Sequence, residues 1–205
     1  MKQFAKYLIA LFCLVFILDR VGGYIFNKLY LENKIGTTGG KINYYLSFKT
    51  PPDLLIMGSS RALFNVIPDS FKVSCYNLAH EGMDDAFQAG LLDILITYNK
   101  VPKTILLHID PHDYSSPSNI YSTRVQNLRY FYGKDSLVTE YINEESFHEK
   151  YFYFFHLYKY NGRAISLLKD VYASHHSFRP TNGYEAIMPD ADDSINTVTL
   201  IQRNI

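Results

Sequence analysis

The stretch LLIMGSSRALF, from Leu54 to Phe64, decides the fold class of this chain. It begins as a continuous apolar run that Gly58 ends, and such a run is typical of a strand buried on both faces of a sheet. Two serines, Ser59 and Ser60, follow directly. The sequence therefore predicts a buried strand that brings hydroxyl groups to its carboxyl end.

Two further apolar runs repeat this pattern, FKVSCYNL at residues 71–78 and KTILLHID at residues 103–110. Between them, residues 83–100 have apolar side chains at helical spacing and two aspartates near the start, where a helix favours negative charge. The order strand, helix, strand is the unit from which parallel sheets are built. We therefore predict an α/β fold with a parallel sheet, which is small because only three buried strands are recognisable.

The charge balance and the cysteine count narrow the classes of ligand. Lys and Arg total 20, as do Asp and Glu, so the formal net charge is zero and nothing points to a nucleic-acid partner. The two cysteines, Cys13 and Cys75, form neither a disulfide framework nor a zinc pattern. We expect no nucleic acid, no metal and no cofactor.

The first 30 residues are expected to form a membrane anchor. Lys2 and Lys6 precede an uncharged apolar run over residues 7–18, and Asp19 and Arg20 interrupt it. This run is shorter than the roughly 20 residues that span a bilayer, so the charged pair should lie near the far interface, snorkelling or pairing. Because basic residues precede the run, the sequence predicts a single-pass protein with its domain outside the cytoplasm.

Two alternatives to an uncleaved anchor stay open. A cleaved signal peptide has small residues at Val21 and Gly23, but the charged pair just before them is a poor cleavage context. A buried core helix is the other alternative. After the anchor, residues 31–52 are rich in glycine and end at two prolines, so they are expected to be a stalk, with the α/β domain over residues 53–205.

Gly58-Ser59-Ser60, at the end of the first strand, resembles the nucleophile block of the SGNH or GDSL-like hydrolases. The resemblance covers roughly residues 53–114 and is to membrane-anchored envelope members, of the DltD-like and polysaccharide O-acetyl-handling types. It implies a flavodoxin-like three-layer sandwich with Ser60 as the nucleophile. It also implies an oxyanion hole that includes Gly82, in the NLAHEG block, and His112, where the family places an asparagine donor.

The family also carries Asp-x-x-His near its C-terminus, and no aspartate in this sequence is followed three positions later by histidine. A serine hydroxyl needs a base to become a good nucleophile. The substitutes that the sequence offers are His80, His112, His175 and His176. We therefore expect either a domain that is truncated at its C-terminus or a protein that has lost the triad.

The sequence also allows other interpretations of these and later residues. His108, Asp110 and His112 alternate as metal ligands on a strand would, although Pro111 breaks the strand. Asp110 could be a phosphoacceptor at a strand end, and no P-loop is present. Arg61 could bind an anionic group or pair with an acid. The aromatic stretch at residues 151–160 would be either a packing helix or a surface that stacks on carbohydrate.

These observations lead to two hypotheses about function. The first is a serine esterase or O-acyltransferase that acts on acylated envelope carbohydrate and uses Ser60. The second is a catalytically inactive or truncated relative that serves as an interaction or assembly factor in the envelope. The expected partners are the membrane and either acylated carbohydrate or envelope proteins.

Overall fold

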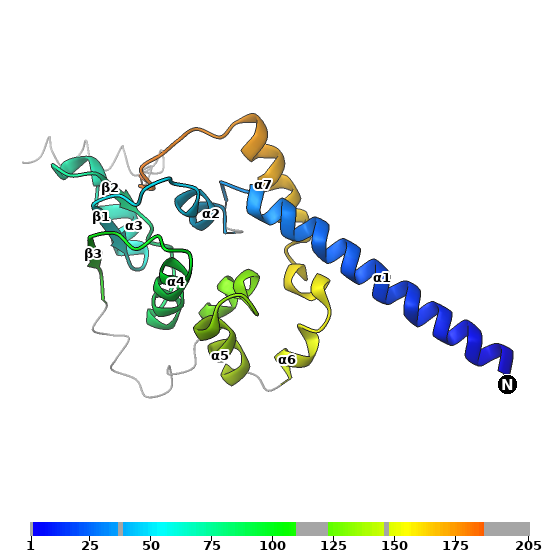
Figure 1. The fold of residues 1–205 in the computed structure, drawn as a ribbon. Helices are drawn as coiled ribbons and strands as arrows, with labels where there is room; N and C mark the ends of the chain where they lie inside the picture. Colours follow the sequence, from blue (N-terminus) through cyan, green and yellow to red (C-terminus); the bar gives the residue numbers. More distant parts are fainter. Residues whose placement is uncertain (1, 37–38, 110–122, 146–147, 187–205) are drawn as a thin grey trace, which may run out of the picture.

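The computed structural model describes residues 2–36, 39–109, 123–145 and 148–186. A three-stranded parallel sheet lies at one end of the molecule (Figure 1), with strand order β2-β1-β3. Its strands are β1 (Leu54–Met57), β2 (Cys75–Asn77) and β3 (Thr104–Leu107). The predicted α/β class and parallel sheet are confirmed.

Helices from the first two connections pack on opposite faces of this sheet. Ile56 packs with Ala62 and Leu63 of α3 (Ser60–Asn65). Its neighbours in β1, Leu55 and Met57, instead join the main core together with α4 (Asp85–Thr97). Because successive side chains of a strand point to opposite faces, this alternation buries β1 completely. The helix expected between residues 83 and 100 is confirmed.

The chain beyond β3 adds a helical layer over α4. Leu128 and Val138, from η4 and α5, are fully buried in the same core cluster as α4. This part of the chain is helical among the described residues. Its elements, with the short η1 before β2, are η1 (Pro68–Ser70), η4 (Thr123–Phe131), α5 (Ser136–Glu145), α6 (Glu149–Phe152), η5 (His156–Tyr160) and α7 (Ala164–His176).

A long apolar helix, α1 (Lys2–Glu32), begins the chain, and its N-terminal half projects away from the rest of the molecule (Figure 1). Among the described residues, it is the one helix that is long and apolar enough to cross a membrane. Its C-terminal part belongs to the core, where the ring of Tyr30 stacks on that of Tyr130 at 4.2 Å. The expected apolar helix is therefore present, and it extends beyond residue 30.

The stalk expected over residues 31–52 is corrected by the structure. This segment contains α2 (Gly40–Leu46), in which Ile42 and Tyr45 are buried in the main core. The hydroxyl of Tyr45 donates a hydrogen bond to the Lys100 carbonyl at 3.0 Å. Two apolar side chains three positions apart form one helical face, and this face has the core as its partner. The segment packs against the domain instead of spacing it from α1.

The two edges of the sheet differ. At the β2 edge, the Asn77 amide donates to the carbonyl of Asn182 at 2.8 Å, so a C-terminal segment lies against this strand. At the β3 edge, Leu106 and Leu107 are each 43% exposed. Among the described residues, β3 is therefore less covered than β2.

Candidate active site

Ser60 is the first residue of α3 and stands directly after the central strand. Gly58 turns the chain with a φ of +137°, and Ser59 takes the N-cap position in an extended conformation without a side-chain capping bond. From β1 the chain goes to β2 on one side and later returns to β3 on the other. Ligands of open α/β sheets bind at such a switch point, outside the carboxyl ends of the strands. The half-buried Ser59 and Ser60 lie at this edge.

The peptide groups of Gly58 are held by Gln88, a buried side chain of α4. The Gly58 amide donates to Gln88 Oε1 at 3.2 Å, and Gln88 Nε2 donates back to the Gly58 carbonyl at 3.1 Å. Burying an amide side chain is costly unless it is hydrogen-bonded, so this pair fixes the turn that precedes Ser60. The sequence analysis missed Gln88. A polar residue directly after Phe87, on the apolar face of the helix, was the signal that could have found it.

Among the described residues, His108 is one of two histidines that lie beside this turn; the other is His80. His108 follows β3, and its amide donates a hydrogen bond to the Met57 carbonyl at 2.9 Å. A Cβ atom added to Gly58 would lie 2.8 Å from the Cβ atom of His108. Its Nδ1 atom is buried and makes no hydrogen bond with the described residues. From the sequence, His108 was interpreted only as one of three alternating residues that could bind a metal ion.

The other two members of that alternating set, Asp110 and His112, lie outside the described residues. The expected oxyanion-hole role of His112 therefore stays a prediction. Within the described ranges, no cluster of three or more His, Cys, Asp or Glu side chains could hold a metal ion.

Gly82 lies in an exposed turn after β2, at the same edge of the sheet as Ser60 because the strands are parallel. Its φ is +66°, and a Cβ atom added there would lie 3.5 Å from the Nη1 atom of Arg124. The turn leads into α4, whose N-cap Asp84 accepts a hydrogen bond from the Phe87 amide at 2.9 Å. The structure thus places Gly82 on the expected edge, where the backbone conformation itself favours glycine.

The proposed substitutes for the missing base divide between two places. His80 follows β2, and its Nδ1 donates to the Leu78 carbonyl at 2.8 Å. Burial, followed by the charge of nearby Lys41, lowers the pKa of His80 to about 3. His175 and His176 both lie on α7, which packs against α1. His80 lies at the turn before Ser60, since its amide donates to the Gly58 carbonyl at 3.0 Å, but its Nδ1 is already bonded to the Leu78 carbonyl.

The lowered pKa of His80 predicts a loss of stability on acidification. Histidine in an unfolded chain has a pKa of about 6.5, so between that pH and about 3 the unfolded state binds a proton that the folded state does not. Urea unfolding midpoints should therefore fall as the pH is lowered from neutral through this window. His80→Asn, whose amide can replace the Nδ1 donor, should show a shallower fall; an unchanged pH dependence would contradict the assignment.

Lys41 of α2 adds a cation near the end of β2. Its Nζ atom donates to the Ala79 carbonyl at 2.9 Å and lies 3.7 Å from a carboxylate oxygen of Glu185. Burial lowers the pKa of Lys41 to about 8, although Glu185 opposes that shift. The sequence analysis missed this residue because it assigned the segment around it to a stalk.

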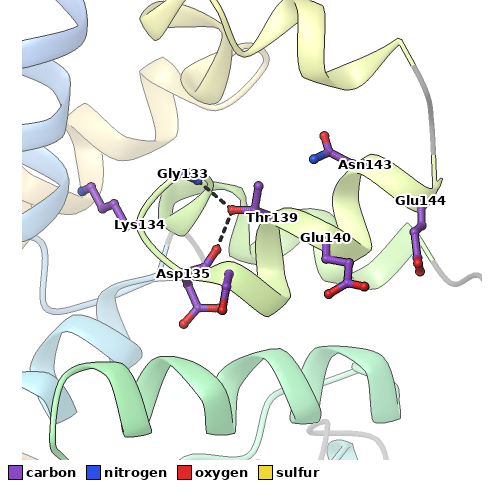
Figure 2. A pocket seen from close by; sticks show the side chains of 8 residues that line it. Gly133, Lys134, Asp135, Thr139, Glu140, Asn143 and Glu144 are labelled. Atoms are coloured by element: carbon purple, nitrogen blue, oxygen red, sulfur yellow. Dashed lines mark hydrogen bonds between the residues drawn. The ribbon is translucent and has the colours of Figure 1, made fainter.

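Two surface hollows lie away from Ser60, and both are formed by the helical layer. The larger, of about 720 Å³, surrounds the turn between η4 and α5, where Figure 2 shows Thr139 bonded to the backbone of Gly133 and Asp135. The smaller, of about 440 Å³, contains Arg129 and Glu149. Arg129 Nε and Glu149 Oε2 are buried there and make no hydrogen bonds within the described ranges. Neither hollow is lined by Ser60, Gly82 or His108.

No protein-family model, no curated protein and no solved structure matches this chain.

Proposed function

We propose that this chain is a membrane-anchored, SGNH-like α/β protein whose Ser60 acts as the nucleophile in acyl transfer from O-acylated envelope carbohydrate. The observation that carries the proposal is the position of Ser60 at the carboxyl end of the central strand, directly after a turn that Gln88 holds rigid. Such a position exposes a hydroxyl above the sheet edge, where substrates of this fold class bind. Helices on both faces of the sheet are in keeping with a small three-layer sandwich.

We assign the base to His108, because it lies against Gly58, the residue that turns the chain toward Ser60. The Ser60 hydroxyl would pass its proton to the imidazole and attack the acyl carbonyl. The ester bond would then break, and the sugar hydroxyl would leave with that proton. Water or a second hydroxyl would release the acyl group from Ser60. The amides of Ser60 and Gly82 are the proposed oxyanion donors.

The C-terminal half of α1 favours an uncleaved anchor over a signal peptide. Cleavage near Val21 or Gly23 would remove Asp19, whose carboxylate accepts hydrogen bonds from the amides of His156 and Leu157 at 2.9 and 3.0 Å. A carboxylate with 6% exposure that caps two amides is a structural part of the domain. With Lys2 and Lys6 on the cytoplasmic side, the domain would lie outside the cytoplasm.

One observation favours the second candidate, a catalytically inactive envelope interaction or assembly factor. In serine enzymes of the triad type, an acidic group orients the histidine through its other ring nitrogen. Within the described part of the chain, His108 Nδ1 has no such partner. A protein whose histidine is oriented by no acid would retain the geometry of an active site but not its catalytic activity.

Turnover of model acyl esters, such as p-nitrophenyl acetate, by the full chain in mild detergent separates the two candidates. If the first candidate is right, Ser60→Ala should lower kcat by up to about 10⁶-fold, as removal of the nucleophile does in serine enzymes. The matched control is Ser59→Ala, which removes the adjacent hydroxyl and should keep the rate near that of the unsubstituted chain. Equal rates for Ser60→Ala and the unsubstituted chain would reject the enzymatic proposal.

A further inference from the structure

The segment from Tyr151 to Leu157 exposes most of its apolar side chains and buries one residue, Tyr153. Tyr153 is 6% exposed and belongs to the main core, whereas Phe154 beside it is 55% exposed. Water would favour the reverse arrangement, because the tyrosine hydroxyl is the group that hydrates well. We call the exposed set the aromatic surface; its members are Tyr151, Phe152, Phe154, Phe155 and Leu157.

This surface is attached to α1 at the point where the exposed apolar part of that helix ends. The Asp19 carboxylate holds the amides of His156 and Leu157, and a Cβ atom on Gly23 would lie 2.3 Å from that of His156. The ring of Phe154 lies 6.1 Å from that of Phe16 and 4.9 Å from the Arg20 guanidinium. Figure 1 shows the segment after α6 beside the middle of α1. The aromatic surface is therefore continuous with the exposed apolar side chains of α1.

The length of α1 before Asp19 determines where the surface of the bilayer lies relative to the domain. Residues 2–18 precede Asp19, and at 1.5 Å per residue they extend about 25 Å. The hydrocarbon core of a bilayer is about 30 Å thick, so this part cannot span it while the domain stays clear of the surface. Beyond Asp19, Val21, Tyr24 and Ile25 remain exposed and continue the apolar face. The bilayer boundary must therefore lie at or beyond the level at which α1 contacts η5.

We propose that the aromatic surface is a membrane contact that inserts into the interfacial layer of the same bilayer that α1 spans. This inference rests on the anchoring part of the proposed function. Phe, Tyr and Leu side chains are suited to this layer, where the apolar rings leave water and nearby cations face the headgroups. The cations are Arg20 and Lys150, the latter with its Nζ 5.1 Å from the Tyr151 ring centroid. The domain would be held at a set height and orientation by two contacts, α1 and this surface.

Tryptophan quenching tests the contact without background, because the chain contains no tryptophan. The full chain carrying Phe154→Trp is reconstituted in phosphatidylcholine vesicles whose acyl chains are brominated near the headgroup end. Its emission should be quenched about threefold more than that of Phe71→Trp, because the interface holds the first ring and water surrounds the second. Phe71 is a matched control: it is partly exposed, at 37%, and follows η1 near the sheet. Phe155→Trp repeats the test without the Phe16 contact.

Leu14→Trp, within the apolar run of α1, separates failure of this inference from failure of the anchor. If Leu14→Trp is quenched and both aromatic-surface variants match Phe71→Trp, the anchor stands and the membrane contact is wrong. If Leu14→Trp is also unquenched, the anchoring proposal fails with it. A blue-shifted but unquenched Phe154→Trp would mean that protein covers this surface, and that result would also overturn the proposal.

Discussion

Asn77→Ala should destabilise the fold by about 3 kcal/mol, since it leaves buried backbone groups without partners. Asn77 is fully buried at the end of β2, and its Nδ2 donates to the carbonyls of Ala62 and Val66 at 2.8 and 3.0 Å. Its Oδ1 accepts from the Ala79 amide at 3.0 Å. One side chain thus satisfies the end of α3 and the start of the turn toward Gly82. Urea unfolding of the full chain in mild detergent, followed by circular dichroism, measures the loss.

The matched control for this substitution is Asn65→Ala. Asn65 is the last residue of α3, the helix whose end Asn77 bonds, but its side chain is exposed and donates one hydrogen bond, to the Arg61 carbonyl at 2.9 Å. Its removal should cost below about 1 kcal/mol, because water replaces an exposed partner. Equal losses for the two variants would contradict the role given to Asn77.

Gly58→Ala should cost about 4 kcal/mol, the sum of backbone strain and a collision with the neighbouring strand. The φ of +137° is one that side-chain-bearing residues rarely adopt. A Cβ atom would also lie 2.8 Å from His108 Cβ and 3.0 Å from the His108 carbonyl oxygen, and the latter is backbone that cannot move aside cheaply. The substitution should therefore push β3 from β1 at the point where we place the base.

Gly133→Ala is the control for strain without collision. Its φ is +75°, and no atom lies within 4 Å of the position that a Cβ would take. It should cost about 1 kcal/mol, the usual penalty for a left-handed residue with a side chain. If Gly58→Ala unfolds at the same urea concentration as Gly133→Ala, the close approach of His108 to Gly58 is wrong.

Much of the sheet could be predicted from the sequence because its strands are short, buried on both faces and separated by clear turn signals. The position of His108 depends in addition on the register of β3 against β1. Parallel pairing aligns Met57 with Leu107, so the next residue of each strand, Gly58 and His108, must be neighbours. Both runs were predicted to lie in one sheet, but their register is known only from the structure.

The features that the sequence did not predict depend on partners that are far away along the chain. Asp19 was interpreted as a charge near the membrane interface, but its hydrogen bonds are to amides 137 and 138 residues later. Tyr45 was assigned to a stalk, although the carbonyl that it contacts is 55 residues away. No local pattern specifies such pairings. The same limit applies to Gln88, whose polarity was visible but whose partner, Gly58, was not.

Labelling with a fluorophosphonate, followed by peptide mass spectrometry, tests the central claim that Ser60 is an activated nucleophile. The full chain in native membranes or mild detergent should carry one phosphonyl adduct on the peptide that contains Ser60. The adduct should persist in Ser59→Ala and disappear in Ser60→Ala and in His108→Gln. An unlabelled chain, or an adduct that survives Ser60→Ala, would contradict the account.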